Sequence, residues 1–405
     1  MIKRGVARLF TAAATVALMT GVAHAEGAKI GALMPMTGDL QAYGKTSYNG
    51  VNLAVKDINA AGGVLGGELE VSVGDTQTNS QAGIDAAQKL VSIENVSGMV
   101  GALSSGVTIP VAQSVTADAE VPQISNASTS PVITGLEDND YLFRTVPSDA
   151  FQGVALAEVA QEKGFGNVGI LYINNDYGEG LAESFGNAFT DKGGEVTAML
   201  AYEPGNASYR GELSKAASEG AEALVLVGYP ENGITIIRQA LEEGYFQNFV
   251  FTDGLKAPEI IESIGAQYLN GSAGTAPQAM ADSTSHERFT TAYEAEYGEL
   301  PPKPYIDTAY DAAYVLGLAI EKAGSTDGVA VRDALRDVAN ASGERILPGE
   351  FAKAKEMLAA GKDIDYVGAS GSIEFDAEGD VSGTFAHWEI EDGAIVTKKV
   401  FEPTM

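Results

Sequence analysis

The sequence predicts an α/β protein made of two lobes, each with a parallel sheet flanked by helices. Short runs rich in β-branched residues alternate with longer amphipathic stretches, and this alternation is typical of repeated strand–helix–strand units. The series occurs twice, and the second one begins near Phe151. At 405 residues the chain is also too long for one ordinary hydrophobic core, so two domains are expected.

The first series predicts four strands and three helices. The strands are expected at residues 29–34, 69–73, 98–100 and 122–125, and the helices at residues 47–60, 80–94 and 109–117. Because a strand that returns parallel to its neighbour needs a crossover helix, this order favours a doubly wound sheet.

The second series repeats the pattern. Strands are expected at residues 168–173, 196–202, 223–227 and 249–252, and helices at residues 151–163, 179–192, 209–219 and 232–243. No linker rich in Pro or Ser separates the two series. We therefore expect short ordered crossings that act as a hinge, with the ligand site in the cleft between the lobes.

The N-terminus predicts a secretory signal peptide at residues 1–25. Three basic side chains precede an apolar run, residues 9–19, that is too short to span a bilayer, and residues 23–25 form an A-x-A cleavage signal. The mature chain should begin at Glu26 and fold as a soluble protein of the periplasm. With no cysteine, it has neither disulfides nor a lipid-bearing N-terminal cysteine.

The charge balance excludes whole classes of partner. The chain has 55 acidic and 25 basic residues, for a net charge of −30. Such a field repels nucleic acid and anionic membranes, and no basic run opposes it. Attraction of cationic ligands is one interpretation of this charge, and solubility of a secreted protein is the other.

Two polar loops are the first candidate binding elements. They span residues 103–108 and 125–131, and each follows a short apolar run and opens a predicted helix. Hydroxyls and free backbone N–H groups at the carboxyl ends of parallel strands suit a carboxylate. For Ser105 and Thr129 the alternative role is capping of a helix N-terminus, which needs no ligand.

Several motifs resemble branched-chain amino-acid binding proteins of ABC importers. They occupy residues 30–38, Tyr43-Gly44, Asn49-Gly50, residues 57–67, Asn175–Gly180 and residues 373–380, so the resemblance covers nearly the whole mature chain. It implies a type I periplasmic-binding fold, an α/β protein with two Rossmann-like lobes whose parallel sheets are joined by a three-strand hinge. Lobe 1 would comprise residues 28–147 and 277–383, and lobe 2 residues 148–276 and 384–405.

The same resemblance implies the roles of individual residues. Ser105, through its hydroxyl and N–H, and Thr129, through its N–H, would hold the α-carboxylate of an amino acid. The Ala127 carbonyl and the Thr129 hydroxyl would accept from its ammonium group, and Asp253 would supply the acid where the family usually has a glutamate. The other expected ligand-binding residues are Leu103, Ser104, Ser128, Tyr43, Tyr177, Tyr229 and Tyr305. For Asp253 the alternative is a turn or cap, and for each tyrosine it is ordinary packing or a surface ring.

The resemblance further implies a monomer that delivers its ligand to a membrane permease, with no cofactor and no metal. Two other functions stay open: binding of a non-amino small carboxylate or amide, and delivery of the ligand to a membrane sensor.

An enzyme is not expected. After signal removal only His286 and His387 remain, without metal spacing, and no nucleophile elbow, dinucleotide fingerprint or P-loop occurs. Residues 376–380 resemble part of a calcium loop but lack its terminal glutamate, so a hairpin turn is expected there.

Overall fold

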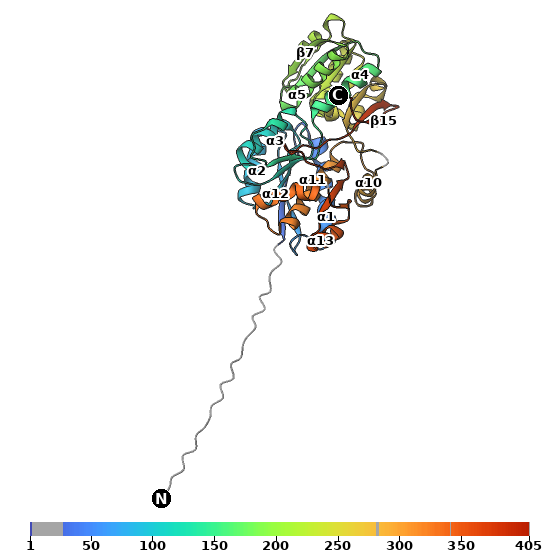
Figure 1. Cartoon of the computed structure of the whole chain (residues 1–405). Helices are drawn as coiled ribbons and strands as arrows, with labels where there is room; N and C mark the ends of the chain where they lie inside the picture. The colour runs from blue at the N-terminus through green and yellow to red at the C-terminus, as the bar shows by residue number, and fades with distance from the viewer. Residues whose placement is uncertain (2–26, 281–282, 341, 405) are drawn as a thin grey trace.

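The computed structural model describes residues 1, 27–280, 283–340 and 342–404. Nearly all of the expected signal peptide lies outside these residues. The chain forms two lobes, and the lobe with α4, α5, β7 and β15 lies above the lobe with α1, α2, α11 and α13 in the view of Figure 1. No helix of the described residues is long and apolar enough to cross a membrane.

The first lobe contains a five-stranded parallel sheet in the order β2-β1-β3-β4-β5. Its strands are β1 (Ala28–Met34), β2 (Leu69–Asp75), β3 (Met99–Gly101), β4 (Gln123–Ser125) and β5 (Leu142–Arg144). Its helices are α1 (Gln41–Ala60), α2 (Ser80–Ser92), α3 (Ser105–Val111), α10 (Thr284–Tyr297), α11 (Ile306–Ala323), α12 (Gly328–Ala339) and α13 (Phe351–Ala359). A small sheet of β11 (Glu344–Ile346), β12 (Ile364–Gly368) and β13 (Gly371–Ser372) completes this lobe.

Side-chain alternation along β1 explains the layers of the first lobe. Ile30, Ala32 and Met34 point into the main core with residues of α1 and α11, whereas Leu33 joins a second core cluster with Leu90 of α2. Successive strand residues face opposite sides of a sheet, so a continuous apolar strand requires helices on both faces.

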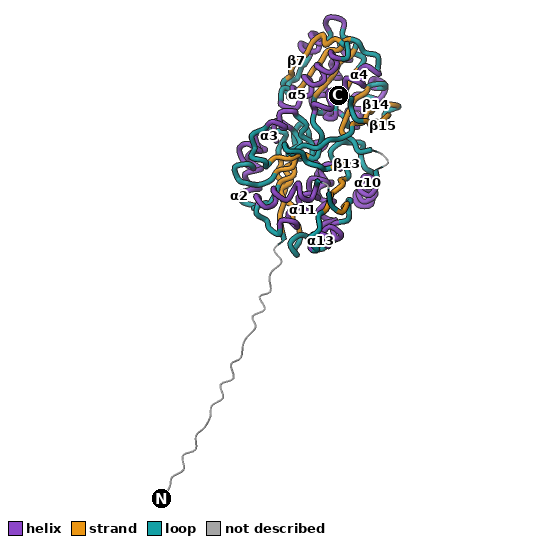
Figure 2. The backbone as a smooth tube through the Cα atoms, in the orientation of Figure 1, coloured by secondary structure: helices purple, strands orange, loops and turns teal. Residues whose placement is uncertain are grey.

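The second lobe contains a seven-stranded sheet in the order β15-β14-β10-β9-β8-β6-β7. Its strands are β6 (Asn167–Ile173), β7 (Glu195–Tyr202), β8 (Ala223–Val227), β9 (Phe249–Phe251), β10 (Ala273–Pro277), β14 (Phe385–Glu391) and β15 (Ala394–Phe401). Its helices are α4 (Asp149–Glu162), α5 (Asp176–Asp191), α6 (Arg210–Ala216), α7 (Pro230–Glu242), α8 (Pro258–Ile264) and α9 (Ala266–Leu269). In both lobes the sheets lie inside and the helices outside, and loops gather where the lobes meet (Figure 2).

The expectation of a purely parallel second sheet needs correction, because β14 and β15 run antiparallel to their neighbours. Only two residues, Asp392 and Gly393, connect these strands, and both have positive φ, 50° and 84°. An Asp-Gly pair with positive φ at both positions forms a tight hairpin turn, which leaves no length for the crossover that a parallel strand requires.

The predicted strands agree with the observed ones to within two residues, but three helices begin three or more residues earlier than predicted. Helix α1 begins at Gln41 rather than at residue 47, α3 at Ser105 rather than at residue 109, and α5 at Asp176 rather than at residue 179. In α3 the ring of Pro110 prevents a helical bond to the Gly106 carbonyl, which instead accepts from the Ser80 hydroxyl at 2.8 Å. Strand β5 was not predicted, and elements after β9 were not predicted individually.

Gly50 lets α1 and α11 approach closely, since a Cβ there would lie 2.2 Å from the Ile306 carbonyl oxygen. We expect Gly50→Ala to lower the free energy of unfolding, measured by urea denaturation, by about 1–3 kcal/mol because the helices must move apart. Gly211 is the matched control, since a Cβ there meets nothing within 4 Å. Unchanged stability in Gly50→Ala would contradict the close packing of these helices.

Candidate functional site

The predicted site residues converge where the carboxyl ends of the two sheets face each other. In the first lobe most of them follow β3 and β4, whereas Tyr43 lies in α1 and Tyr305 directly precedes α11; in the second lobe they follow β6, β8 and β9. The parallel parts of both sheets have one topology, with β1 and β3 adjacent in the first and β6 and β8 adjacent in the second. Ligands of open α/β sheets bind at the carboxyl edge beside such a switch point, so each lobe offers half of a site.

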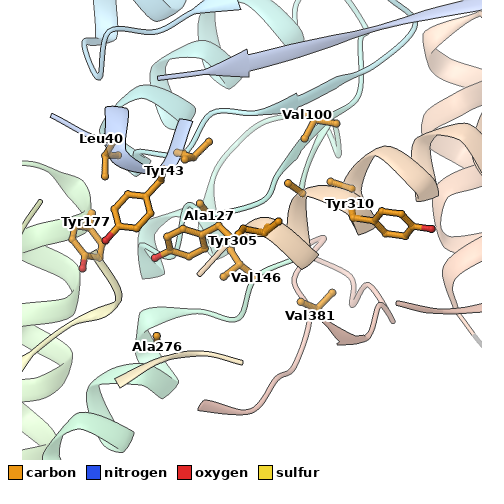
Figure 3. Close-up of a cluster of buried hydrophobic side chains, with 14 of the residues drawn as sticks. Leu40, Tyr43, Val100, Ala127, Val146, Tyr177, Ala276, Tyr305, Tyr310 and Val381 are labelled. Atoms are coloured by element: carbon orange, nitrogen blue, oxygen red, sulfur yellow. The ribbon is translucent and has the colours of Figure 1, made fainter. Parts of the chain in front are cut away.

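An enclosed cavity lies at this junction. It is lined by Leu40, Leu103, Ala127, Tyr177, Tyr229, Asp253, Gly254 and Tyr305. Its volume of about 10 Å³ is near the minimum for one water molecule. The hydroxyls of Tyr43 and Tyr305 point toward Tyr177, whereas that of Tyr310 points away (Figure 3). A larger ligand therefore requires the lobes to separate or the tyrosines to move.

Direct contacts between the lobes show that the cleft is closed. The Tyr43 hydroxyl donates to the Gly254 carbonyl at 3.0 Å, and the hydroxyls of Ser104 and Tyr229 are 3.0 Å apart. At the edge of the cleft, the Lys303 ammonium forms an ion pair with Glu259.

Asp253 is the acid at the centre of the cavity. Its side chain accepts hydrogen bonds from Gln152 Nε2 at 2.7 Å, from the Tyr177 hydroxyl at 2.9 Å and from the Tyr305 hydroxyl. Burial raises the pKa of Asp253, and these three donors partly offset the rise. None of the ion pairs among the described residues includes Asp253, and its charge is stabilised by two hydroxyls, the Gln152 amide and a backbone N–H. The Asp253 side chain therefore does not act as the turn or cap residue of the alternative interpretation.

A second buried acid, Asp149, was missed by the sequence analysis. Its Oδ2 accepts from the Thr129 hydroxyl at 2.8 Å, and its Oδ1 is buried without a partner. Burial and the nearby charge of Asp253 raise the pKa of Asp149 well above the usual carboxyl range. The Thr129 hydroxyl donates its hydrogen bond to Asp149, so the lone pairs of Thr129 Oγ1 stay available to an incoming N–H donor.

Asp149 was missed because the predicted helix began at Phe151, after Asp149, whereas Gln152 lay within that helix but was not singled out as a site residue. Helix α4 begins at Asp149, where the Ser148 hydroxyl caps it by accepting from Ala150 N at 3.3 Å. Residues three apart on a helix share a face, so one face of α4 carries both Asp149, which contacts Thr129, and Gln152, which contacts Asp253. The Ser148-Asp149 pair was the available signal, because both residue types favour helix starts.

The two polar loops carry free hydrogen-bond donors. The Ser105 hydroxyl accepts from Ser130 N at 3.2 Å and retains its own proton for donation. Among the described residues, the backbone N–H groups of Ser105, Gly106 and Thr129 have no partner. Neither Ser105 nor Thr129 caps a helix through its side chain, contrary to the capping alternative.

Ser104 and Ser128 have their hydroxyls engaged by protein groups. The Ser104 hydroxyl contacts Tyr229, and the Ser128 hydroxyl lies 2.7 Å from Thr108 Oγ1 and near the carbonyls of Ala102 and Leu103. Ser128 therefore braces the two polar loops against each other and does not line the cavity.

Four tyrosine hydroxyls act as donors or contacts across the cavity. Burial raises the pKa of Tyr43, Tyr177 and Tyr305 well above the usual phenol range, and the Asp253 charge adds to this effect. They therefore stay protonated at neutral pH. The rings of Tyr177 and Tyr229 stack at 5.5 Å and cover one side of the cavity.

Other parts of the described chain offer no competing site of this kind. A larger open space of about 660 Å³, lined by residues such as Phe151, Arg345 and Thr384, contains none of the predicted site residues. No group of three or more His, Cys, Asp or Glu side chains among the described residues could hold a metal ion. Asp376 accepts from the backbone N–H groups of Glu378 and Asp380, which closes a turn.

Comparisons with known proteins agree with this geometry. Residues 27–357 match the family described as periplasmic binding protein. The chain is 30% identical over 331 residues to the leucine-, isoleucine-, valine-, threonine- and alanine-binding protein of Pseudomonas aeruginosa, covering 81% of this chain and 87% of that one. It is 25% identical to the chemotactic signal transduction system substrate-binding protein BasB of Halobacterium salinarum, covering 92% and 89%.

Solved structures give the same result. The leucine-binding protein LivK of Thermotoga maritima matches with a TM-score of 0.79 and 28% identity over 93% of this chain and 99% of that one. LivJ of Streptococcus pneumoniae in complex with isoleucine matches with a TM-score of 0.78 and 26% identity over 93% and 100%. A solute-binding protein of Rhodopseudomonas palustris in complex with 3,4-dihydroxybenzoic acid shares the fold, with a TM-score of 0.74 and 20% identity over 94% and 98%.

The coupling between the two buried acids can be measured by carboxyl carbon NMR titration of the ligand-free protein. We expect Asp253→Asn to lower the pKa of Asp149, because the substitution removes a like charge. Asp311→Asn, which changes a buried carboxylate elsewhere in the first lobe, should leave the pKa of Asp149 unchanged. An unchanged Asp149 pKa in Asp253→Asn would show that the two acids do not interact.

Proposed function

Because this chain belongs to the periplasmic binding protein family, we propose that it is the solute-binding component of an ABC importer and captures an amino acid between its lobes. The ligand would be a branched-chain or related amino acid. Its relatives in Pseudomonas aeruginosa and Streptococcus pneumoniae are named for, or hold, such ligands. The names of these relatives support an amino-acid ligand, and the charge of the cavity gives the physical reason for one.

The observation that carries the proposal is a pair of buried acids, neither of which forms an ion pair among the described residues. Asp149 and Asp253 are both at most 1% exposed, and Asp149 Oδ1 has no partner. An ammonium group beside Asp253 would give its carboxylate a charge-assisted hydrogen bond and would reduce the repulsion between the two acids. An aromatic or aliphatic acid without an amine would instead add a third negative charge. The site therefore favours amino acids over simple carboxylates.

The proposed pose uses donors and acceptors on opposite sides of the cavity. The ligand carboxylate would accept from the Ser105 hydroxyl and from the free N–H groups of Ser105 and Thr129. The ammonium group would donate to the Ala127 carbonyl, to Thr129 Oγ1 and to Asp253. The lining residues Leu40 and Leu103 would contact the side chain, which suits an apolar ligand.

Closure of the lobes would follow docking of the ligand on the first lobe. Three segments join the lobes, between β5 and α4, between β10 and α10, and between β13 and β14. We place the lobe limits at residues 147/148, 276/277 and 383/384, within or beside these segments. Closure would bring Tyr177, Tyr229 and Asp253 onto the ligand, and the permease would recognise the closed shape. The protein would act as a periplasmic monomer after removal of residues 1–25.

A second candidate function is delivery of the ligand to a membrane sensor, favoured by the similarity to BasB over 92% of this chain. Both functions use the same cleft. Deletion of the gene would abolish uptake of the amino acid in the first case, and movement toward it with uptake intact in the second.

The requirement for an ammonium group can be tested with leucine and 4-methylpentanoate, which differ by that group alone. We expect leucine to stabilise the protein in a thermal shift assay and 4-methylpentanoate to have little effect. Asp253→Ala should weaken amino-acid binding, measured by calorimetry, by roughly 3–5 kcal/mol because a buried ammonium loses its partner.

Asp75→Asn, at the carboxyl end of β2 and outside the cavity lining, is the control and should bind as the wild type does. Because the cavity does not specify which amino-acid side chain binds best, the other amino acids are screened together with leucine. Wild-type affinity in Asp253→Ala, or tighter binding of 4-methylpentanoate than of any amino acid, would exclude an amino-acid site of this design.

Closure can be followed by small-angle scattering after unfolding, dialysis and refolding to remove ligand carried from the host. Saturation with the bound amino acid should reduce the radius of gyration, because the lobes rotate together as rigid bodies. Thr129→Ala should weaken binding by roughly 1–3 kcal/mol through lost hydrogen bonds to charged groups, with the fold intact. A scattering profile that does not change on saturation would argue against hinge closure.

A further inference from the structure

Arg144, the last residue of β5, lies beside the loop of Thr129 but does not line the cavity. Its side chain is fully buried, and all five of its N–H donors have acceptors. Nε and Nη2 each donate to one oxygen of Asp380 at 2.6 Å, and Nη2 also donates to Thr134 Oγ1 at 2.9 Å. Nη1 donates to the carbonyl oxygens of Ser130 at 3.0 Å and Ser128 at 3.4 Å.

The bond to the Ser128 carbonyl fixes the direction of the next N–H group. In a trans peptide the carbonyl of one residue and the N–H of the following residue point in opposite directions. Because the Ser128 carbonyl turns toward Arg144, the Thr129 N–H turns away from Arg144. That N–H has no partner among the described residues, and Ala127, two residues earlier, lines the cavity.

Asp380 keeps the guanidinium in this orientation. The two groups form a bidentate ion pair, and the Thr134 hydroxyl donates to Asp380 Oδ2 at 2.7 Å while it accepts from Arg144. A planar guanidinium is able to hold a carboxylate and two carbonyls at once, whereas a lysine offers a single point charge. The positive charge also polarises the peptide between Ser128 and Thr129, which makes its N–H a stronger donor.

We propose that Arg144 is the positioning residue for the ligand carboxylate: it orients and polarises the peptide between Ser128 and Thr129 so that the Thr129 N–H meets that carboxylate. This inference rests on the proposed function. Arg144 itself does not touch the ligand. Its removal should therefore affect the carboxylate end of a ligand and leave the ammonium end, held by Asp253, almost unaffected.

The test compares amino acids with their amides, which keep the ammonium group and side chain but lack the negative charge. Leucine, isoleucine, valine, threonine and alanine are each measured against the corresponding amide by calorimetry. We expect Arg144→Lys to reduce amino-acid affinity by roughly 10- to 100-fold, as for a lost hydrogen bond to a charged group, and amide affinity by less than about threefold. The preference for the acid over the amide should therefore fall.

The matched control is Asp311→Asn. Asp311 is a buried carboxylate of the first lobe that accepts from Tyr366, Ala369 and Ser370, away from the polar loops. Asp311→Asn should lower thermal stability without changing the preference for the acid over the amide. Asp380→Asn is a second test if Arg144→Lys does not fold, and it should lower that preference in the same direction by a smaller factor.

Equal loss of affinity for acid and amide in Arg144→Lys would show a merely structural role and overturn the inference. If Arg144→Lys does not fold, the same result in Asp380→Asn would overturn it. The proposed function would still stand as long as the wild-type protein binds amino acids. Absence of wild-type binding to every amino acid and amide would overturn the proposed function and this inference together.

Discussion

Two buried carboxyl groups at the junction of the lobes determine how the rest of the site is arranged. Asp149 and Asp253 come from the second lobe, and side chains of both lobes donate to one or the other. The hydroxyls of Thr129, Tyr177 and Tyr305 and the amide of Gln152 all do so. These neutral donors reduce the cost of burying the carboxylates without neutralising them, and burial still raises both pKa values.

This arrangement links ligand chemistry to lobe closure. Thr129 and Tyr305 belong to the first lobe, so their bonds to Asp149 and Asp253 form across the cleft. In the closed structure the cavity has a volume of only about 10 Å³, and the Tyr305 hydroxyl contacts the same carboxylate that the proposed ligand ammonium would use. A ligand would therefore have to compete with Tyr305 for Asp253 and offer a stronger, charged donor. This competition favours amines over neutral molecules of the same shape.

Much of the fold and part of the site follow from local sequence. The eight strands that were predicted agree to within two residues because their apolar runs are short and bounded by polar residues. In contrast, α1, α3 and α5 begin at Gln41, Ser105 and Asp176, before their apolar pattern is established. The motifs placed Leu103, Ala127, Tyr177, Tyr229, Asp253 and Tyr305, all of which line the cavity. Ser128 was placed in the right loop, but its hydroxyl bonds to Thr108 because the two polar loops pack together.

The sequence by itself determined the two α/β lobes and the polar loops at the strand ends, because these depend on periodicity and on neighbours close in the chain, and the family resemblance of its motifs indicated Asp253. Only the tertiary structure decided that Asp149 and Gln152 join Asp253, that Arg144 pairs with Asp380 across 236 positions, and that β14 and β15 close the second sheet in antiparallel order. These contacts depend on the path by which the chain leaves and re-enters each lobe. Sequence spacing does not encode that path, since the free energy of each contact comes from burial and charge in the folded state.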